Sequence, residues 1–362
     1  MESTPLLREG VEEVIGMDDQ VLLFDADSGV YHRVGPLVAA VVRKFDGRLT
    51  HSQIADLISA DYPNSSPLDV ARIDELVEGL HEKSLLAGDT AQRRKRGGLD
   101  RLLPRFLVFK KFSSVLAPAA SLVRKISHPI LAAITCLVAI AGYIFGISTL
   151  FSVESRVLTT PEASQLASSV LLALIIHLLG VFLHESWHGI IAGACGQPIR
   201  GLGFALMFWV IPVAYVDRTD AYRLRNRSGR VAIALAGMVS DGWVMGATAL
   251  VATSTTGLAH ATALVLLTYQ LLLLIANLNP LAPSDTVAAI EAATGSIDIR
   301  GRSMAIFRAT IFRTPLPSYL RNLSLHRRVL LFIYGLLSIA FAAWAICFVV
   351  YTLWSGLIQG VR

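Results

Sequence analysis

Two histidines and a glutamate stand near the middle of the sequence with the spacing of a metal site. The segment reads His184-Glu185-Ser186-Trp187-His188. On a helix, positions i and i+4 lie on one face, so the two imidazoles can bind one zinc ion. Zinc lowers the pKa of a bound water, and Glu185 is placed to take the proton and pass it to a leaving amine. The pattern therefore indicates metal-assisted hydrolysis.

The setting of this segment strengthens that interpretation. It lies in an otherwise apolar stretch, 167–193, where a glutamate and two histidines are costly unless they serve a site. A buried polar cluster without metal is the competing interpretation. His177 lies seven residues before His184, on the same helical face but about 10 Å away, so it cannot bind the same ion. It is interpreted as a substrate-binding or water-path residue, or as a packed core histidine.

A catalytic zinc needs a third protein ligand. The candidate is Asp285, which ends the run NLNPLAPSD at residues 277–285, after the fourth apolar stretch. Pro280 and Pro283 lack N–H donors and are expected to end the helix there. The break allows the chain to turn Asp285 back towards the two histidines.

Membrane-spanning helices are the elements that must hold these residues. Of the 362 residues, 54% are hydrophobic and only 16% are charged, whereas soluble domains average about a quarter charged. This composition excludes a disordered, collagen-like or ordinary soluble protein. Five apolar stretches reach the roughly 20 residues needed to cross the hydrocarbon core, namely 130–152, 167–193, 231–253, 257–282 and 329–358. The sequence predicts a polytopic α-helical membrane protein in contact with the lipid bilayer.

The distribution of lysine and arginine predicts the orientation of these spans. With the N-terminus in the cytoplasm, three inside segments next to the spans, 89–129, 194–230 and 283–328, carry 23 Lys and Arg residues. The outside segments, 153–166, 254–256 and the C-terminal tail, carry 2. Basic residues concentrate on the cytoplasmic side of membrane proteins. The predicted location is therefore the cell membrane, with a cytoplasmic N-terminal domain. His184 and Asp285 then both lie towards the cytoplasmic side of their spans.

An acidic region precedes the spans. Residues 1–88 contain 7 Lys and Arg against 16 Asp and Glu, so binding to nucleic acid is not expected. Two β-prone runs flank a polar, glycine-containing turn at 25–29 and predict a hairpin. Helical patterns follow at 36–45, at 51–61 with Thr50 as the cap, and at 67–85. These elements predict a small α+β, winged-helix-like domain.

Two further segments connect these parts. A basic linker, 89–127, joins the N-terminal domain to the membrane body at 128–362, and part of the linker is expected to lie on the bilayer surface. A short apolar run at 203–216 contains Pro212 and is too short to span. It is predicted to be a strand or a re-entrant segment.

The N-terminal domain resembles the PqqD family. The resemblance rests on the hairpin runs at 21–25 and 29–32, on Phe45-Asp46-Gly47, on Ile54-Ala55 and on the run 80–86. It covers about residues 8–88. It implies a recognition element that binds the leader part of a precursor peptide as a strand beside the hairpin, against the third helix. An unrelated small helical domain is the alternative interpretation.

The membrane body resembles the site-2 protease class of intramembrane zinc metalloproteases. That class pairs HExxH on one span with N-x-x-P-x-x-x-x-D-G on a later one, and Asn277, Pro280 and Asp285 stand at those spacings. The resemblance covers about residues 167–290. It implies that His184, His188 and Asp285 bind Zn²⁺. It also implies that Glu185 is the general base and that Asn277 hydrogen-bonds the substrate or the oxyanion.

The body departs from this pattern at two positions. Thr286 stands where the class has a glycine after the aspartate, and Met238 stands where it has a proline after Ala236-Gly237. Because glycine permits a tight turn, the loop that carries Asp285 is expected to have a different shape. Asp241, an intramembrane carboxylate in the third apolar stretch, stays open as an alternative ligand.

Together these features predict an intramembrane zinc metalloprotease that hydrolyses a peptide bond in a precursor peptide. The predicted role is leader removal during maturation of a ribosomally made natural product. Regulated proteolysis of a membrane-anchored signalling protein is an alternative, with the N-terminal domain as a sensor. A non-catalytic peptide-binding or export module is another. The sequence predicts neither the cleavage site nor the oligomeric state.

Overall fold

Contacts within the chain divide it into two compact units. One unit joins Met1–Pro118 to Ala192–Asn226, and the other joins Ala119–Ile191 to Arg227–Arg362. In this division, residues 192–226 group with the N-terminal region. The domain boundaries expected from the sequence, at residues 88 and 127, stay predictions. The computed structural model describes residues 4–16, 19–62, 69–89, 105–157, 163–207, 211–296, 298–316, 318–321 and 323–360.

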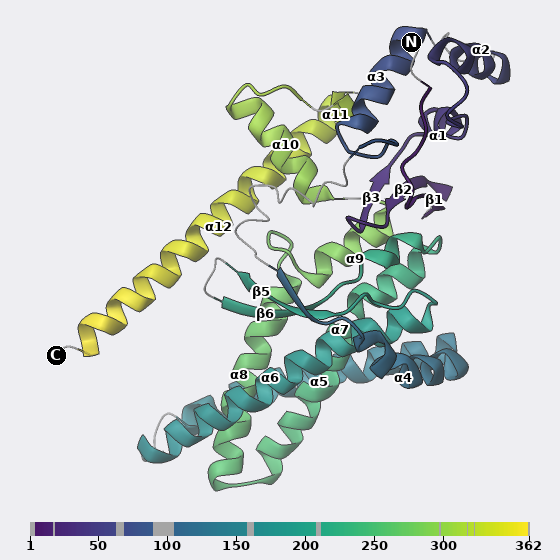
Figure 1. The fold of residues 1–362 in the computed structure, drawn as a ribbon. Coiled ribbons are helices and arrows are strands. Elements are labelled where there is room, and N and C mark those ends of the chain that lie inside the picture. The colour runs from purple at the N-terminus through teal and green to yellow at the C-terminus, as the bar shows by residue number, and fades with distance from the viewer. Residues whose placement is uncertain are drawn as a thin grey trace. The chain divides into compact units, whose positions relative to one another are not determined.

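An antiparallel sheet opens the first unit. It consists of β1 (Val11–Ile15), β2 (Val21–Asp25) and β3 (Val30–Arg33), in the order β1-β2-β3 (Figure 1). β2 and β3 form the predicted hairpin. Its turn is closed by the Asp25 carboxylate, which accepts hydrogen bonds from the Asp27 amide (3.1 Å) and the Ser28 hydroxyl (2.6 Å). The strand β1 was not predicted, because its sequence, VEEVI, lacks the apolar–polar alternation that marks a half-buried strand.

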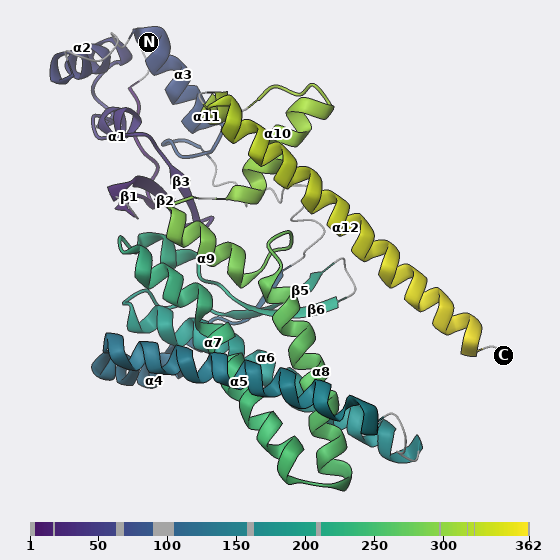
Figure 2. The same ribbon diagram turned by 180° about the vertical axis from the view of Figure 1, so that it is seen from behind.

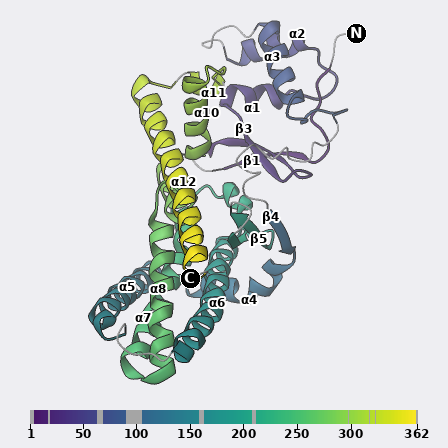
Figure 3. The same cartoon turned by 90° about the vertical axis from the view of Figure 1, so that its left-hand side faces the viewer.

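Three helices share a core with this sheet. They are α1 (Pro36–Val42), α2 (His51–Asp61) and α3 (Val70–His81), and Figure 3 shows them gathered beside it. Thr50 caps α2 as expected, in a capping box with Gln53. The predicted start of the third helix at residue 67 lies outside the described residues. The largest fully buried side chains of this core are Leu23, Val41, Ile54, Ile58, Ile73 and Leu85.

A second antiparallel sheet combines the linker with the segment after the second span. β4 (Arg105–Phe109) pairs with β5 (Leu202–Met207), which pairs with β6 (Ile211–Val216). The apolar run at 203–216 is therefore a β-hairpin. The strand β4 was not predicted, because the strand with which it pairs follows about a hundred residues later. The basic stretch of the linker at 90–104 lies outside the described residues.

The β2–β3 hairpin contacts the segment around η2 (Thr219–Arg223). The Tyr31 hydroxyl donates a hydrogen bond to Asp220 (2.7 Å) and accepts one from Arg223 Nε (2.6 Å). Arg200 donates to both Asp220 oxygens through Nε (3.0 Å) and a terminal nitrogen (2.8 Å). The Phe24 ring lies 5.0 Å from the Arg200 guanidinium carbon and 4.7 Å from that of Arg223, which is cation–π distance. These five residues are called the hairpin clasp below.

Long helices dominate the second unit. Five of them, as predicted, are long and apolar enough to cross a membrane within the part of the chain that the structure describes. They are α5 (Pro129–Val157), α6 (Ala163–Ala194), α7 (Arg227–Ser254), α8 (Gly257–Leu278) and α12 (Leu325–Gly360). The shorter helices are α4 (Phe112–Ile126), α9 (Asp285–Thr294), α10 (Ile299–Ile311) and α11 (Ser318–Arg321), and Figure 2 shows α10 beside α12.

The helix α7 is the centre of this unit, because it packs against α5, α8 and α9. Its contact with α5 depends on glycine. A Cβ atom at Gly142 of α5 would lie 2.0 Å from the Gly242 carbonyl oxygen of α7, so only glycine fits at Gly142. Small residues let membrane helices approach closely, and dispersion contacts between them then replace the hydrophobic effect, which lipid does not supply. The same helix, α7, contacts the histidines of α6 through Ile233 and Asp241.

Candidate metal centre

The helix α6 presents both histidines of the HExxH segment from one face. His184 is 5% exposed and His188 is fully buried, while Glu185 is half-buried. The ring centroids of His184 and His188 lie 4.8 Å apart, as expected for residues separated by one helical turn. Burial of two imidazoles in an apolar bundle requires partners for their ring nitrogens.

A break between two helices places Asp285. The helix α8 ends at Leu278, as its prolines predict, and α9 begins at Asp285. The Ser284 side chain caps α9 by accepting the amide of Val287 and donates its own hydroxyl to the Asn279 carbonyl (2.8 Å). Asp285 thus stands in the first turn of α9, and it is 6% exposed.

These elements bring His184, His188 and Asp285 together. The two Nε2 atoms lie 3.1 Å apart, and each lies 3.0 Å from Asp285 Oδ2. The three residues form the group that could hold a metal ion among the residues the structure describes. Ligand atoms about 2.0–2.1 Å from a tetrahedral zinc ion are roughly 3.3 Å from one another. The observed triangle is slightly tighter than that, so the donor set fits zinc in size and in chemistry.

The second nitrogen of each ring is held by α7. His188 Nδ1 lies 2.6 Å from the Ile233 carbonyl oxygen, and His184 Nδ1 lies 2.7 Å from Asp241 Oδ2. A carbonyl and a carboxylate only accept hydrogen bonds, so both Nδ1 atoms carry the proton. In neutral rings the Nε2 lone pairs then face each other and Asp285. Three lone-pair donors converging in this way favour a cation between them.

Close packing by Gly237 completes this support. Positions 233, 237 and 241 repeat every four residues and therefore share one face of α7. A Cβ atom at Gly237 would lie 2.4 Å from the His184 ring and 2.6 Å from His188 Nε2. Any larger residue would push the imidazoles apart. The glycine of the Ala236-Gly237 pair thus has a packing reason that is independent of any turn.

The geometry separates the two candidate aspartates. Asp285 faces the Nε2 side of both rings, whereas Asp241 contacts the opposite nitrogen, Nδ1, of His184. Asp241, the alternative ligand, is therefore not one of the three converging residues. Asn277 lies in the last turn of α8, with its amide nitrogen buried and without a partner among the described residues. His177 is half-buried, with its ring 5.5 Å from that of Tyr269, and the structure does not bring it into the metal group.

The two departures from the site-2 protease pattern touch each other. The Thr286 hydroxyl lies 3.9 Å from the Met238 sulfur, so the residue after Asp285 contacts the residue after Gly237. The Met238 carbonyl accepts a hydrogen bond from the Tyr143 hydroxyl of α5 (2.6 Å). These contacts link α5, α7 and α9. The unusual residues therefore belong to one local contact.

Sequence reasoning missed Ile233, which contacts a ligand, and three polar residues elsewhere in the spans. Ile233 contributes a main-chain carbonyl, which no side-chain pattern reveals. Tyr143, Thr248 and Gln270 are polar residues inside apolar spans, and that is a signal in the sequence that could have identified them. Gln270 donates from its amide nitrogen to the Thr248 hydroxyl (3.1 Å).

No model of a protein family matches the chain, and neither a curated protein nor a solved structure matches it. The function proposed below therefore rests on the residues of this chain and on their geometry.

Proposed function

We propose that the protein is an intramembrane zinc endopeptidase. The observation that carries the proposal is the convergence of His184 Nε2, His188 Nε2 and Asp285 Oδ2 at 3.0–3.1 Å, with Glu185 next to one of the ligands. Three protein ligands with an open fourth position are typical of catalytic zinc sites, whereas structural sites use four. When bound, zinc would polarise the scissile carbonyl and make water acidic enough to lose a proton near neutral pH.

Glu185 supplies the proton transfer in this proposal. It follows His184 by one residue and is half-buried, and it is not among the three converging residues. The Glu185 carboxylate takes a proton from the attacking water and delivers it to the nitrogen of the breaking C–N bond. The products are one free carboxyl group and one free amine.

Asn277 is the proposed donor to the substrate. Its side-chain amide nitrogen is buried and makes no hydrogen bond among the residues described. A buried donor without a partner is unfavourable by about 1–3 kcal/mol, which a substrate carbonyl would relieve. An amide donor of this kind stabilises the charge that develops on the carbonyl oxygen during hydrolysis.

The proposed substrate is a precursor peptide whose leader is removed. β3 is an edge strand of the N-terminal sheet, and an edge strand can pair with an extended peptide through main-chain hydrogen bonds. In this proposal the N-terminal domain binds the leader, and the zinc site cleaves the attached chain. An extended or locally unwound substrate is required, because the carbonyls of a helix are already hydrogen-bonded.

Metal analysis and peptide cleavage test the proposal together. The full chain is purified in detergent, its zinc content is measured, and it is incubated with synthetic precursor peptides encoded beside its gene. We expect about one zinc per chain and cleavage by the wild type. Glu185→Gln should keep the zinc and lose cleavage, because the base is not a ligand. The matched control is Ser186→Ala, since that hydroxyl donates to the Phe182 carbonyl of its own helix (2.7 Å).

Two outcomes would overturn the proposal. A wild-type chain without stoichiometric zinc would remove the metal site. Cleavage by Glu185→Gln at the wild-type rate would remove the assigned base. Loss of both zinc and cleavage in Ser186→Ala would show that substitutions on α6 act through folding instead.

A further inference from the structure

Asp241 is a carboxylate within a membrane-spanning helix, and the three converging ligand atoms do not include it. Its side chain is only 14% exposed, and its Oδ2 atom lies 2.7 Å from His184 Nδ1. An ionisable side chain at this depth is unfavourable unless it has a partner and a purpose. The partner of Asp241 is the His184 ring nitrogen that faces away from Asp285. Any effect of Asp241 on the ligand group is therefore expected to act through His184.

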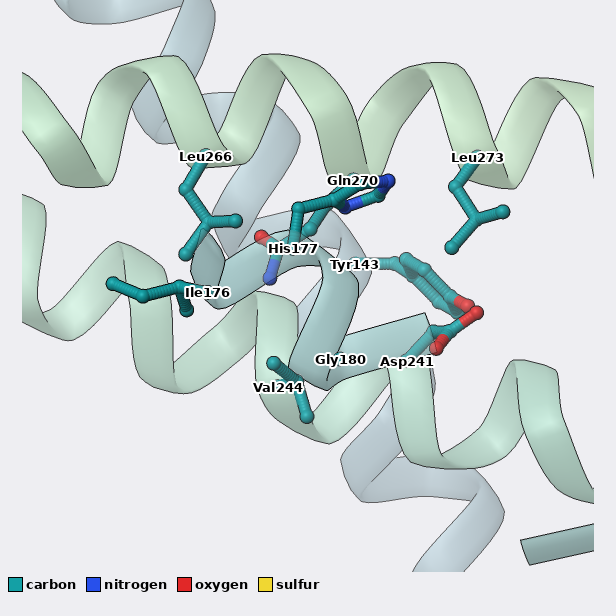
Figure 4. A pocket seen from close by; sticks show the side chains of 9 residues that line it. All are labelled: Tyr143, Ile176, His177, Gly180, Asp241, Val244, Leu266, Gln270 and Leu273. Atoms are coloured by element: carbon teal, nitrogen blue, oxygen red, sulfur yellow. The ribbon is translucent and has the colours of Figure 1, made fainter. Parts of the chain in front are cut away.

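A small cavity lies beside Asp241. Its polar lining comes from Tyr143, His177, Asp241 and Gln270, which belong to four different helices (Figure 4). The Gln270 side-chain oxygen is buried and has no hydrogen-bond partner within the described ranges. The cavity volume is about 20 Å³, and a single water needs about 10–15 Å³. The cavity therefore has room for one water, which can donate a hydrogen bond to Gln270.

We propose that Asp241 is a positioning residue that fixes the His184 ring for metal binding, and that one buried water in the adjacent cavity helps to solvate the carboxylate. This inference rests on the proposed zinc site and adds a role outside its three ligands. A carboxylate that accepts from Nδ1 holds the proton there and leaves the Nε2 lone pair directed at Asp285. The negative charge also makes the ring a better electron donor to a cation.

The two histidines differ in the group that accepts a hydrogen bond from Nδ1. His188 is backed by the neutral carbonyl of Ile233, while His184 is backed by an anion. The main chain orients His188 whatever side chain occupies position 233. Only a side chain orients His184, so a single substitution at Asp241 can release one ligand and leave the other in place. The water is needed because Asp241 and Gln270 both present acceptors to the cavity, and a water can donate to two acceptors at once.

Zinc affinity measured without any substrate tests this role. The metal-free full chain in detergent is titrated with zinc against a competing chelator. We expect Asp241→Ala to bind zinc about 10- to 100-fold more weakly than the wild type, the range usual for partners of metal-binding histidines. Asp241→Asn should lose less, because its amide oxygen can still accept from Nδ1. The matched control is Ser240→Ala, because the Ser240 hydroxyl donates to the Gly237 carbonyl of its own helix (2.8 Å).

A cobalt spectrum separates positioning from ligation. At saturating Co²⁺, Asp241→Ala should keep the visible absorption of the wild type, because the three ligands remain. Asp285→Ala should change that absorption, because it removes a ligand. A changed spectrum in Asp241→Ala with an unchanged one in Asp285→Ala would exchange the two roles and overturn the inference.

Further outcomes distinguish this inference from the proposed function. Wild-type zinc affinity in Asp241→Ala would refute the positioning role while leaving the zinc site intact. A wild-type chain that binds no zinc would refute the proposed function itself. Weaker binding in Ser240→Ala equal to that in Asp241→Ala would assign the effect to helix packing. An experimental structure that resolves ordered waters should show one in the cavity, and a dry cavity would remove the water from the proposal.

Discussion

Tyr31 of the N-terminal hairpin and Asp220 of η2 lie 189 residues apart in the sequence, and a hydrogen bond of 2.7 Å joins them. Arg200 and Arg223 bind the same pair from the Asp220 and Tyr31 sides. The hairpin that is proposed to receive the leader peptide is thereby attached to the segment that follows the HExxH helix. Within this unit, one set of side-chain contacts therefore joins two segments that are far apart in the sequence.

Removing Asp220 should loosen this attachment. Asp220→Ala leaves the Arg200 guanidinium without its carboxylate, and an unmatched, partly buried donor is unfavourable by about 1–3 kcal/mol. We expect amide hydrogen exchange in β3 and η2 to rise about 10-fold or more. Asp56→Asn is the control, because Asp56 is exposed on α2. Equal exchange in the wild type and Asp220→Ala would show that the clasp does not hold the hairpin.

The clasp should also respond to acid. Burial raises the pKa of Asp220, but hydrogen bonds from Arg200 and Tyr31 and the charges of Arg200 and Arg223 outweigh it and hold the pKa below its ordinary value. A carboxylate with a lowered pKa contributes stability above the unfolded value, about 3.9, and loses it as the pH falls through the lower folded value. Protection of β3 and η2 should therefore be constant near neutral pH and fall below about pH 4. In Asp220→Asn this part of the acid response should disappear.

Gly237 should be essential for metal binding. Gly237→Ala places a methyl group 2.4 Å from the His184 ring, so the imidazoles must move and the three ligand atoms separate. We expect zinc content to fall well below one per chain. Gly180→Ala on α6 is the control, because a Cβ atom there meets nothing within 4 Å and alanine favours a helix by about 1 kcal/mol over glycine. Full zinc in Gly237→Ala would contradict the packing argument.

Asn277 should affect cleavage without affecting zinc. Asn277→Asp keeps the size of the side chain but removes its N–H donors, and Asn277→Ala removes the group altogether. If the amide donates to the developing oxyanion, kcat should fall by about 10²- to 10³-fold in both variants, with the zinc content unchanged. An increase in KM alone would assign Asn277 to substrate binding instead. Wild-type kinetics in both variants would remove Asn277 from the site.

Removal of the N-terminal domain tests peptide capture. A truncated chain that starts at Leu99 keeps every proposed ligand and should still bind zinc. Because tethering raises the local concentration of substrate, its loss should raise KM on the order of a hundredfold and change kcat far less. The comparison uses the same precursor peptide for both chains. Equal kcat/KM for the full and truncated chains would favour a sensor role for the domain.

The sequence by itself determined the elements whose cause is local. Five apolar stretches predicted the five long helices, because crossing hydrocarbon requires about 20 apolar residues in a row. Thr50 predicted a helix cap, and it caps α2 in the structure. The i, i+4 spacing placed His184 and His188 on one face, and Pro280 and Pro283 predicted the break before Asp285. In each case the interacting groups lie within a few residues of one another.

Only the tertiary structure decided which distant groups meet. β4 forms by pairing with β5, a strand about a hundred residues further along the chain. The hairpin clasp joins residues whose spacing follows no helix or strand period. Asp241 lies in the middle of one apolar span, and Asp285 follows the end of the next. The sequence predicted Asp285 as the third ligand and left Asp241 as the alternative. Their positions differ because α7 approaches His184 from the Nδ1 side and α9 from the Nε2 side. Helix packing sets that direction, through contacts such as Gly142 with Gly242, and no local pattern encodes it.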